Sequence, residues 1–142
     1  MAEISRSKAR VIISKALAFG LEKNMKPLSV LVLDTGGHPK AFERADGASP
    51  GRFKITEAKA YGSLMLGIGG YAQRKRAEEQ GYFFNAVNGV FEGRVLPVPG
   101  GVLVRDKKGA IIGAVGVSGD SSENDADAAI AGIEAAGFIA EA

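Results

Sequence analysis

The sequence predicts an α+β protein built on an antiparallel sheet. Segments with strand character occur in neighbouring groups joined by short glycine-rich turns, and they do not alternate singly with helices. The expected order is one helix, two strands, two or three helices, three strands and a last helix. The 142 residues contain no evident linker or repeat, so a single domain over residues 1–142 is expected.

The first helix is expected over residues 3–23. Ser5 has a side chain suited to an N-cap, and Ile4 and Ala9 are spaced to form a hydrophobic staple around it. Asn24 can adopt the left-handed conformation that ends a helix. Helical spacing of the apolar residues between these two ends predicts one buried face.

A hairpin is expected next. Residues 28–34 form a short apolar run rich in branched side chains, which is typical of a buried strand. Residues 35–39 have the composition of a turn, and residues 40–44 read as the returning strand.

Two or three helices are expected in the middle of the chain. Ser49-Pro50 predicts a helix start, because proline at the first helical position loses no needed N–H group. The glycines at 67–70 end that helix, and residues 71–80 form another. Residues 83–87 are expected to add one short turn before a loop at Asn88-Gly89.

The pattern then changes to that of strands. Three strands are expected at residues 94–98, 102–105 and 110–117. Residues 99–101 join the first two, and residues 106–109 have the composition of a tight hairpin turn. Ser121 or Ser122 is expected to cap the last helix, whose acidic first turn suits the helix dipole.

Composition excludes several kinds of site and partner. The chain has no cysteine, which excludes disulfides, thiolate metal sites and a cysteine nucleophile, and its single histidine, His38, excludes sites that need two imidazoles from one chain. With 18 basic and 16 acidic residues the net charge is +2, so no nucleic-acid partner is expected. No apolar stretch approaches the roughly 18–20 residues of a membrane helix, and no signal peptide is evident. No membrane association and a cytoplasmic location are therefore expected.

His38 is the first candidate for chemistry. It lies in a turn after the expected buried strand, beside two glycines. An imidazole can transfer protons near neutral pH, and its neutral form is the usual haem or metal ligand. An ordinary turn residue would have the same sequence context.

Three further ionisable residues, Arg44, Asp46 and Lys59, lie at the ends of expected elements, where they could converge with His38. Arg44 and Lys59 suit a carboxylate, whether a haem propionate or a small organic acid.

Three blocks of sequence resemble the GlcG/HbpS family, also known as haem-degrading-like or PduO C-terminal-like domains. They are residues 32–48 (VLDTGGHPKAFERADGA), 97–102 (PVPGGV) and 112–119 (IGAVGVSG). Lys59-Ala60 and Ala131-Gly132 fit the family's helices as well, so the resemblance covers nearly the whole chain. One position departs, because the family commonly has Asp-Glu where this chain has Asp125-Ala126.

The resemblance implies a profilin-like, three-layer α+β sandwich with a central antiparallel sheet of about five strands flanked by helices. It also implies a homo-oligomer. The positions of this chain that match the family's pocket are His38, Arg44, Asp46 and Lys59, with backbone from Gly100 and Gly101.

Three functions follow as hypotheses. The first is a haem-binding or haem-responsive protein, in which His38 is the axial metal ligand and Arg44 or Lys59 pairs with the propionates; Tyr61, Tyr71 or a neighbouring subunit could also supply a ligand. The second is a cofactor-free hydrolase, lyase or dehalogenase acting on a small organic acid, with His38 or Asp46 moving a proton. The third is an assembly partner without chemistry.

Overall fold

The computed structural model describes residues 3–142. Five antiparallel strands form one sheet in the order β2-β1-β4-β3-β5. The strands are β1 (Ser29–Leu33), β2 (Pro39–Arg44), β3 (Gly101–Arg105), β4 (Ile111–Ser118) and β5 (Ile139–Glu141). The helices are α1 (Arg6–Glu22), α2 (Arg52–Leu66), α3 (Gly70–Glu79), α4 (Gly81–Val90) and α5 (Ser122–Ala135). The predicted α+β fold with a five-stranded antiparallel sheet is confirmed.

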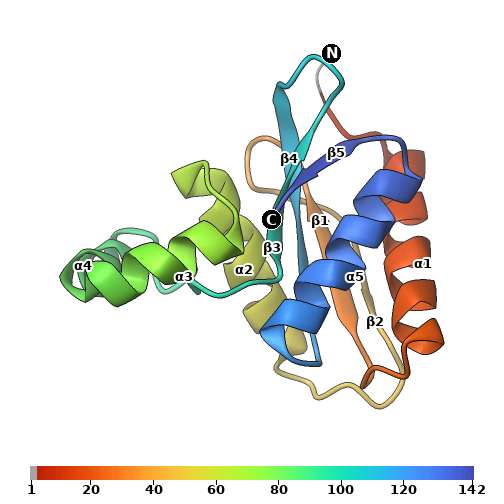
Figure 1. Ribbon diagram of the computed structural model, residues 1–142, viewed down its shortest axis with the longest axis horizontal. Helices are drawn as coiled ribbons and strands as arrows, with labels where there is room; N and C mark the ends of the chain where they lie inside the picture. The colour runs from red at the N-terminus through yellow and green to blue at the C-terminus, as the bar shows by residue number, and fades with distance from the viewer. Residues whose placement is uncertain (1–2) are drawn as a thin grey trace.

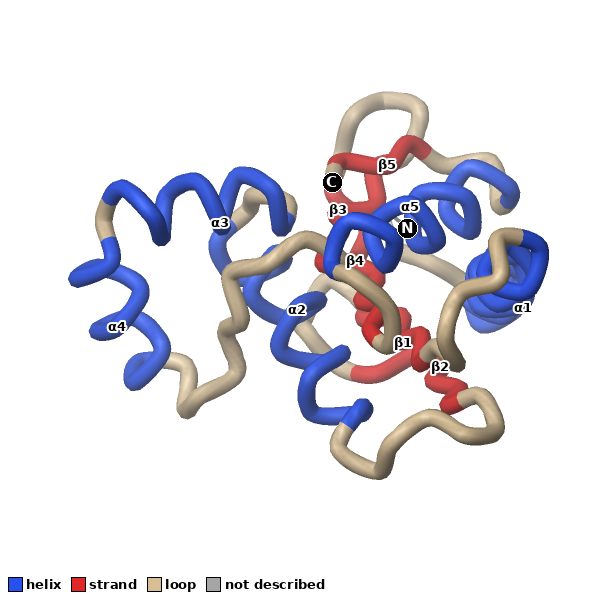
Figure 2. Tube along the Cα trace, turned by 60° about the horizontal axis from the view of Figure 1, so that its bottom comes forward, coloured by secondary structure: helices blue, strands red, loops and turns tan. Residues whose placement is uncertain are grey.

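Helices cover both faces of the sheet. Helices α1 and α5 lie on one face and α2 on the other, while α3 and α4 form an arm that projects from the body on the α2 side (Figures 1 and 2). Alternate residues of β1 enter the two cores, with Val30 and Val32 facing α1 and α5 and Leu31 and Leu33 facing α2. This alternation follows from the two-residue period of a strand.

The predicted helix ends are largely confirmed. The N–H of Lys8 donates to the Ser5 hydroxyl, and the two staple residues, Ile4 and Ala9, are both fully buried. Asn24 has φ 56° after the end of α1. At the other end of the chain Ser121, of the two candidates, caps α5.

The middle helices are longer or later than predicted. Helix α2 begins at Arg52, because residues 50 and 51 form a turn that precedes it. The expected short turn at 83–87 is the ten-residue helix α4, which continues through Asn88-Gly89. Its last turn closes when the N–H of Phe91 donates to the Val87 carbonyl.

The prediction of a strand at 94–98 is wrong. This segment runs along α2 outside the sheet, where the N–H of Leu96 donates to the Ala58 carbonyl and Val95 is buried against α2. Its apolar residues indicated burial, but Pro97 and Pro99 lack the N–H groups that a strand ladder needs. The fifth strand is instead β5, which pairs with β3.

Two glycines let α2 lie unusually close to the sheet. A Cβ placed on Gly101 would stand 2.1 Å from the Lys59 carbonyl oxygen, and one on Gly116 would stand 2.3 Å from the Thr56 carbonyl oxygen. Both distances are too short for any side chain. The glycines of β3 and β4 therefore set the position of α2, which carries Lys59 and Tyr61.

Candidate functional site

The structure separates the predicted site residues into three places. Lys59, on the side of α2 that faces the sheet, lies next to Gly100 and Gly101. Arg44 lies at the end of β2, and Asp46 lies just beyond it. His38 lies in the turn that precedes β2. Arg44 follows His38 by six positions of extended chain, which corresponds to roughly 20 Å along the strand. The structure thus does not bring His38 together with Arg44, Asp46 and Lys59.

Lys59 forms a buried ion pair with Asp125. Its Nζ donates to Asp125 Oδ2 over 2.9 Å and to the Val117 carbonyl over 3.1 Å. The two side chains are only 4% and 1% exposed. The pair joins α2 to the first turn of α5 at the end of β4, so the Lys59 ammonium is enclosed and already occupied.

Asp125 has competing influences on its charge. Burial raises the pKa of its carboxyl group, while the nearby Lys59 ammonium and the Asp120 N–H, which donates to Asp125 Oδ1 over 2.9 Å, oppose that rise. A buried charge without such partners would be costly. The Lys59 ammonium therefore favours the charged form of the Asp125 carboxyl group.

Gly100 packs against this ion pair, and Gly101 packs against the backbone of Lys59. A Cβ on Gly100 would stand 2.9 Å from Lys59 Nζ and 2.7 Å from the Val117 carbonyl oxygen, and Gly100 has φ +113°, a value that side chains rarely allow. The space left by the missing side chains is filled by α2 and β4. Close packing explains why both positions are glycine.

Arg44 and Asp46 are exposed and lie near two small cavities. Asp46 lines an apolar cavity of about 250 Å³ with Met25 and Leu28. Arg44 donates to the Ala48 carbonyl over 2.9 Å, and Ala48 lines a second cavity of about 230 Å³ together with Arg52. These residues share one end of the sheet.

Asp120 should make the free energy of unfolding depend on pH in the acid range. Its pKa is lowered to about 2 because the Lys26 N–H and the Asn124 side-chain amide donate to its carboxylate. Because the pKa of Asp120 is lower in the folded state than in the unfolded state, the carboxylate stabilises the fold at pH values above the unfolded pKa of 3.8. That stabilisation is lost as the pH falls toward 2. Asp120→Asn should remove this dependence, costing about 1 kcal/mol at pH 6 once solvent screening is allowed for.

Urea unfolding of wild type and Asp120→Asn at pH 6 and pH 2.5 checks this, because the two proteins should differ less at the lower pH. Asp106→Asn removes the carboxylate of another turn, at residues 106–109, and is the matched control. An equal difference between wild type and Asp120→Asn at both pH values would contradict the prediction.

The turn before β2 is ordered by Asp34. Its Oδ1 accepts the N–H of Gly36 over 2.9 Å and the N–H of His38 over 3.0 Å, and its carbonyl accepts the N–H of Gly37. His38 is exposed at this turn. The backbone of His38 is therefore fixed while its imidazole is open to solvent.

A half-buried aromatic surface adjoins this turn. A Cβ on Gly37 would stand 3.0 Å from the Tyr61 ring and 3.3 Å from the Met65 methyl group, so both α2 side chains contact the turn. Phe91 packs edge-on against Tyr61, with ring centres 5.9 Å apart. We call Tyr61, Met65, Phe91 and Arg94 the Tyr61 surface.

Arg94 lies across the Tyr61 ring. Its Cζ is 4.0 Å from the ring centre, and its Nη2 donates to the Tyr61 hydroxyl over 3.1 Å. Since Arg94 has no acidic partner within residues 3–142, its charge is available to an anion beside the ring. The Tyr61 surface thus combines apolar rings and one cation, and it contacts the turn that carries His38.

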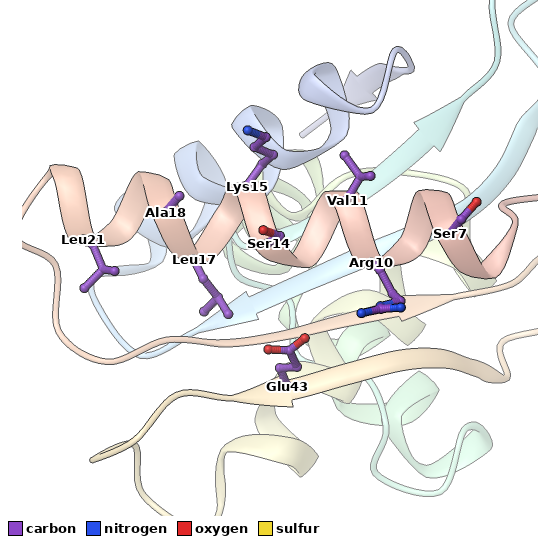
Figure 3. Close-up of a pocket in the computed structure, with 9 residues that line it drawn as sticks. All are labelled: Ser7, Arg10, Val11, Ser14, Lys15, Leu17, Ala18, Leu21 and Glu43. Carbon is purple, nitrogen blue, oxygen red and sulfur yellow. The ribbon is translucent and has the colours of Figure 1, made fainter.

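A larger groove lies on the far side of the molecule. It has a volume of about 630 Å³ and runs along α1 and β2 (Figure 3). Its lining contains no His, Tyr or Met side chain that could ligate an iron.

Tyr71, another candidate ligand, lies on α3 beneath Arg74, away from both the groove and the Tyr61 surface. Within residues 3–142, no three His, Asp or Glu side chains gather into a metal site.

The model of the HbpS-like family, described as a haem degrading protein family, matches residues 4–134. That range runs from just before α1 to the last turn of α5. The chain belongs to the HbpS-like family. The family resemblance inferred from the three sequence blocks is thereby confirmed.

Several solved structures have the same fold. The PduOC haem complex matches with a TM-score of 0.83 at 21% identity, over 94% of each chain. The ORFY protein of Klebsiella pneumoniae matches with a TM-score of 0.83 at 22% identity, over 94% of this chain and 90% of the other. A double mutant of Streptomyces reticuli HbpS matches with a TM-score of 0.79 at 23% identity, over 93% of this chain and 86% of the other. No curated protein matches significantly.

Membership of the HbpS-like family supports a haem-related function and a small-molecule ligand. In the described part of the chain no helix is both long and apolar enough to cross a bilayer.

Sequence reasoning missed two residues that the structure brings to these sites. In the sequence, Asp125 indicates only a favourable charge at a helix start, and its pairing with Lys59 depends on the packing of α5 against α2. The sequence pattern places Arg94 at the start of a strand. The residues next to Arg94 in the sequence carry no signal for its stacking on Tyr61, which lies 33 positions away.

Proposed function

We propose that this protein binds haem at the turn before β2, with His38 as the axial ligand. The observation that carries the proposal is that the turn bearing the exposed His38 is contacted, at the neighbouring Gly37, by the half-buried Tyr61 surface. Haem needs an imidazole or similar donor for its iron, an apolar surface for its ring and cations for its propionates. Family membership supports the same ligand class.

Each residue would have a distinct role. His38 would hold the iron, and Asp34 would keep the His38 backbone in place through the two N–H groups that it accepts. Tyr61 and Phe91 would contact the porphyrin, and Arg94 would pair with a propionate. When bound, haem supplies an iron centre whose reactivity depends on its axial ligand.

Arg94, and not Arg44 or Lys59, would be the cation that pairs with a propionate. Lys59 is buried and paired with Asp125, and Arg44 lies roughly 20 Å along β2 from His38. Arg94 is nearer to the turn, through its contact with Tyr61. The same separation disfavours a cofactor-free enzyme in which His38 moves a proton for an anion held by Arg44 within one chain. Asp46 shares one end of the sheet with Arg44, so an enzyme that uses Asp46 stays a prediction. A homo-oligomer and a cytoplasmic location remain predictions.

Haemin titration followed by visible absorbance tests the proposal. Wild type should give a saturable one-to-one Soret shift. His38→Ala should change the band position and weaken binding about tenfold or more, since it removes the axial ligand. Arg94→Ala should weaken binding severalfold without moving the band, because the iron ligand is retained.

Arg44→Ala is the matched control and should bind haemin like wild type. Retention of the wild-type band and affinity in His38→Ala would show that haem does not use this ligand. A weak, non-saturable shift in every protein would mean that haem only adsorbs, and the search would turn to small organic acids.

A further inference from the structure

The loop from β2 to α2 passes one end of the sheet (Figure 1), and a small cavity lies beside it. The cavity has a volume of about 230 Å³, and its lining includes Lys26, Ser49, Arg52 and Gly119. These residues come from three separate parts of the chain: the segment after α1, the loop before α2 with the start of that helix, and the turn after β4. We call this site the Arg52 cavity.

The charged residues that line the Arg52 cavity are both cations. Lys26 and Arg52 lie in its wall, and no Asp or Glu of residues 3–142 does. Neither cation forms an ion pair within that part of the chain. Arg52 is half-buried although it has no acidic partner there. A half-buried guanidinium without a counter-charge favours an anion beside it.

Two acidic residues border the cavity without lining it. Asp120 accepts the backbone N–H of Lys26 over 2.9 Å and the side-chain amide of Asn124 over 2.7 Å. Asp46 lines the neighbouring apolar cavity instead. Neither carboxylate forms an ion pair with Lys26 or Arg52, so both cations keep their charge for a ligand.

Hydrogen bonds hold the rim of the cavity in place. Arg44 donates to the Ala48 carbonyl over 2.9 Å, and the N–H of Ala48 donates to the Ala45 carbonyl over 3.1 Å. The N–H of Arg52 donates to the Ser49 carbonyl over 3.2 Å. A rim that is already ordered lowers the entropic cost of binding a ligand.

The start of α2 adds to the positive charge at this place. Gly51 at its N-cap supplies no side-chain cap, and its first turn contains no acidic residue. The first N–H groups of a helix have no partners within the helix and favour an anion. This contribution has the same sign as the charges of Lys26 and Arg52.

Buried hydroxyl groups continue inward from the cavity. Thr56 lies one turn after Arg52 and shares a hydrogen bond of 2.7 Å with Ser118. Ser29 pairs with Ser118 in the sheet, and its side chain lies on the α2 face, two residues before Leu31 on that face. The Ser29 hydroxyl is fully buried and has no hydrogen-bond partner within residues 3–142. The interior at this end of α2 is therefore polar, and one of its hydroxyl groups is unsatisfied.

We propose that the Arg52 cavity binds a phosphate group, either free or carried by a small monoester. A phosphate monoester carries a charge of about −1.5 to −2 at neutral pH and three acceptor oxygens, which suits two cations. The planar Arg52 guanidinium can donate to two oxygens, and the Lys26 ammonium and the Ser49 hydroxyl can donate to others. This site is separate from the one proposed for haem and does not depend on it.

An apolar cavity of about 250 Å³ adjoins the Arg52 cavity, since Lys26 and Pro27 line both. Met25 and Leu28 are among its other lining residues. An apolar group attached to the phosphate would lie there and lose its contact with water. Phenyl phosphate and inorganic phosphate are therefore the probes that separate an ester from free phosphate.

Titration of the ¹⁵N-labelled chain with inorganic phosphate at constant ionic strength is the first test. The amide signals of Ser49, Arg52 and Gly119 should shift to saturation in the millimolar range. Arg52→Gln and Lys26→Gln should each weaken binding about tenfold, because each removes a charge-assisted hydrogen bond. Lys54→Gln removes an exposed cation of the same helix that does not line the cavity, and it should bind like wild type. Circular dichroism checks that the variants are folded.

Two comparisons test the chemistry of the site. Arg52→Lys keeps the charge but not the planar fork, so it should bind phosphate better than Arg52→Gln and less tightly than wild type. Acetate, with one charge, should bind at least tenfold more weakly than phosphate. No saturation with phosphate, equal binding of acetate, or an equal loss in Lys54→Gln would overturn the proposal.

Phenyl phosphate distinguishes the two sources of the phosphate group. Tighter binding than inorganic phosphate would identify an ester, and Ala45→Leu, which fills the apolar cavity, should then remove the difference. Equal binding of the two would identify free phosphate, and binding of neither would overturn the site. Haemin titration of Arg52→Gln should match wild type, so failure of this site and failure of the haem proposal are told apart.

Discussion

Asp125→Asn should destabilise the protein by about 3–5 kcal/mol. The substitution keeps the shape of the side chain but removes the negative charge 2.9 Å from Lys59 Nζ. The Lys59 ammonium would then be buried without a counter-charge, and that cost is much larger than the value of an exposed ion pair. Urea unfolding followed by circular dichroism measures the loss. Domains of this size unfold at about 5–15 kcal/mol, so the change is a large fraction of the total.

Two further variants serve as controls for Asp125→Asn. Glu123→Gln breaks the exposed ion pair with Arg74 near the same helix end and should leave stability unchanged within error. The double variant Lys59→Met with Asp125→Leu should recover most of the loss, because no buried charge remains. If Asp125→Asn unfolds within about 1 kcal/mol of wild type, the pair is not buried as described.

Gly101→Ala should cost about 3 kcal/mol or more, at the upper end of what overpacking costs. The new methyl group would lie 2.1 Å from the Lys59 carbonyl oxygen and 2.6 Å from Ser63 Oγ. Backbone cannot move aside as a flexible side chain can, so α2 would have to separate from β3. Thermal unfolding should show a melting temperature lower by about 6–12 °C, from the usual scaling for domains of this size.

Gly89→Ala is the matched control for the same added methyl group. It lies in α4 with open space around its Cβ position, and alanine there should raise stability by up to about 1 kcal/mol. Equal stability of Gly101→Ala and wild type would mean that β3 and α2 are farther apart than the structure places them. Haem binding by a folded Gly101→Ala would separate a packing role for this glycine from a direct role in the ligand site.

The ion pair and the glycines explain why Lys59 is not free to bind a ligand in this chain. Its ammonium joins α2 to α5, and Gly100 lies against that ammonium while Gly101 lies against the Lys59 backbone. The position that commonly carries a glutamate in the resembling family is Ala126 here, and it is fully buried.

Local signals in the sequence determined much of the fold. The Ser5 cap and its staple, the left-handed Asn24, the stop at Gly67 and the Ser121 cap each depend on a few adjacent residues, and all are present. Such features need only side chains within one turn of the chain. The family could also be read from short blocks of sequence for the same reason, since each block is continuous.

Tertiary structure alone decided what depends on residues far apart. The apolar pattern at 94–98 predicted burial but could not say whether the partner is a strand or α2. The short β5 has only three residues, too few for a pattern, and exists because β3 offers it an edge. Lys59 finds Asp125 across 66 positions, and His38 is separated from Arg44 by the length of β2. Residue types state which chemistry is available, but only packing decides which side chains meet.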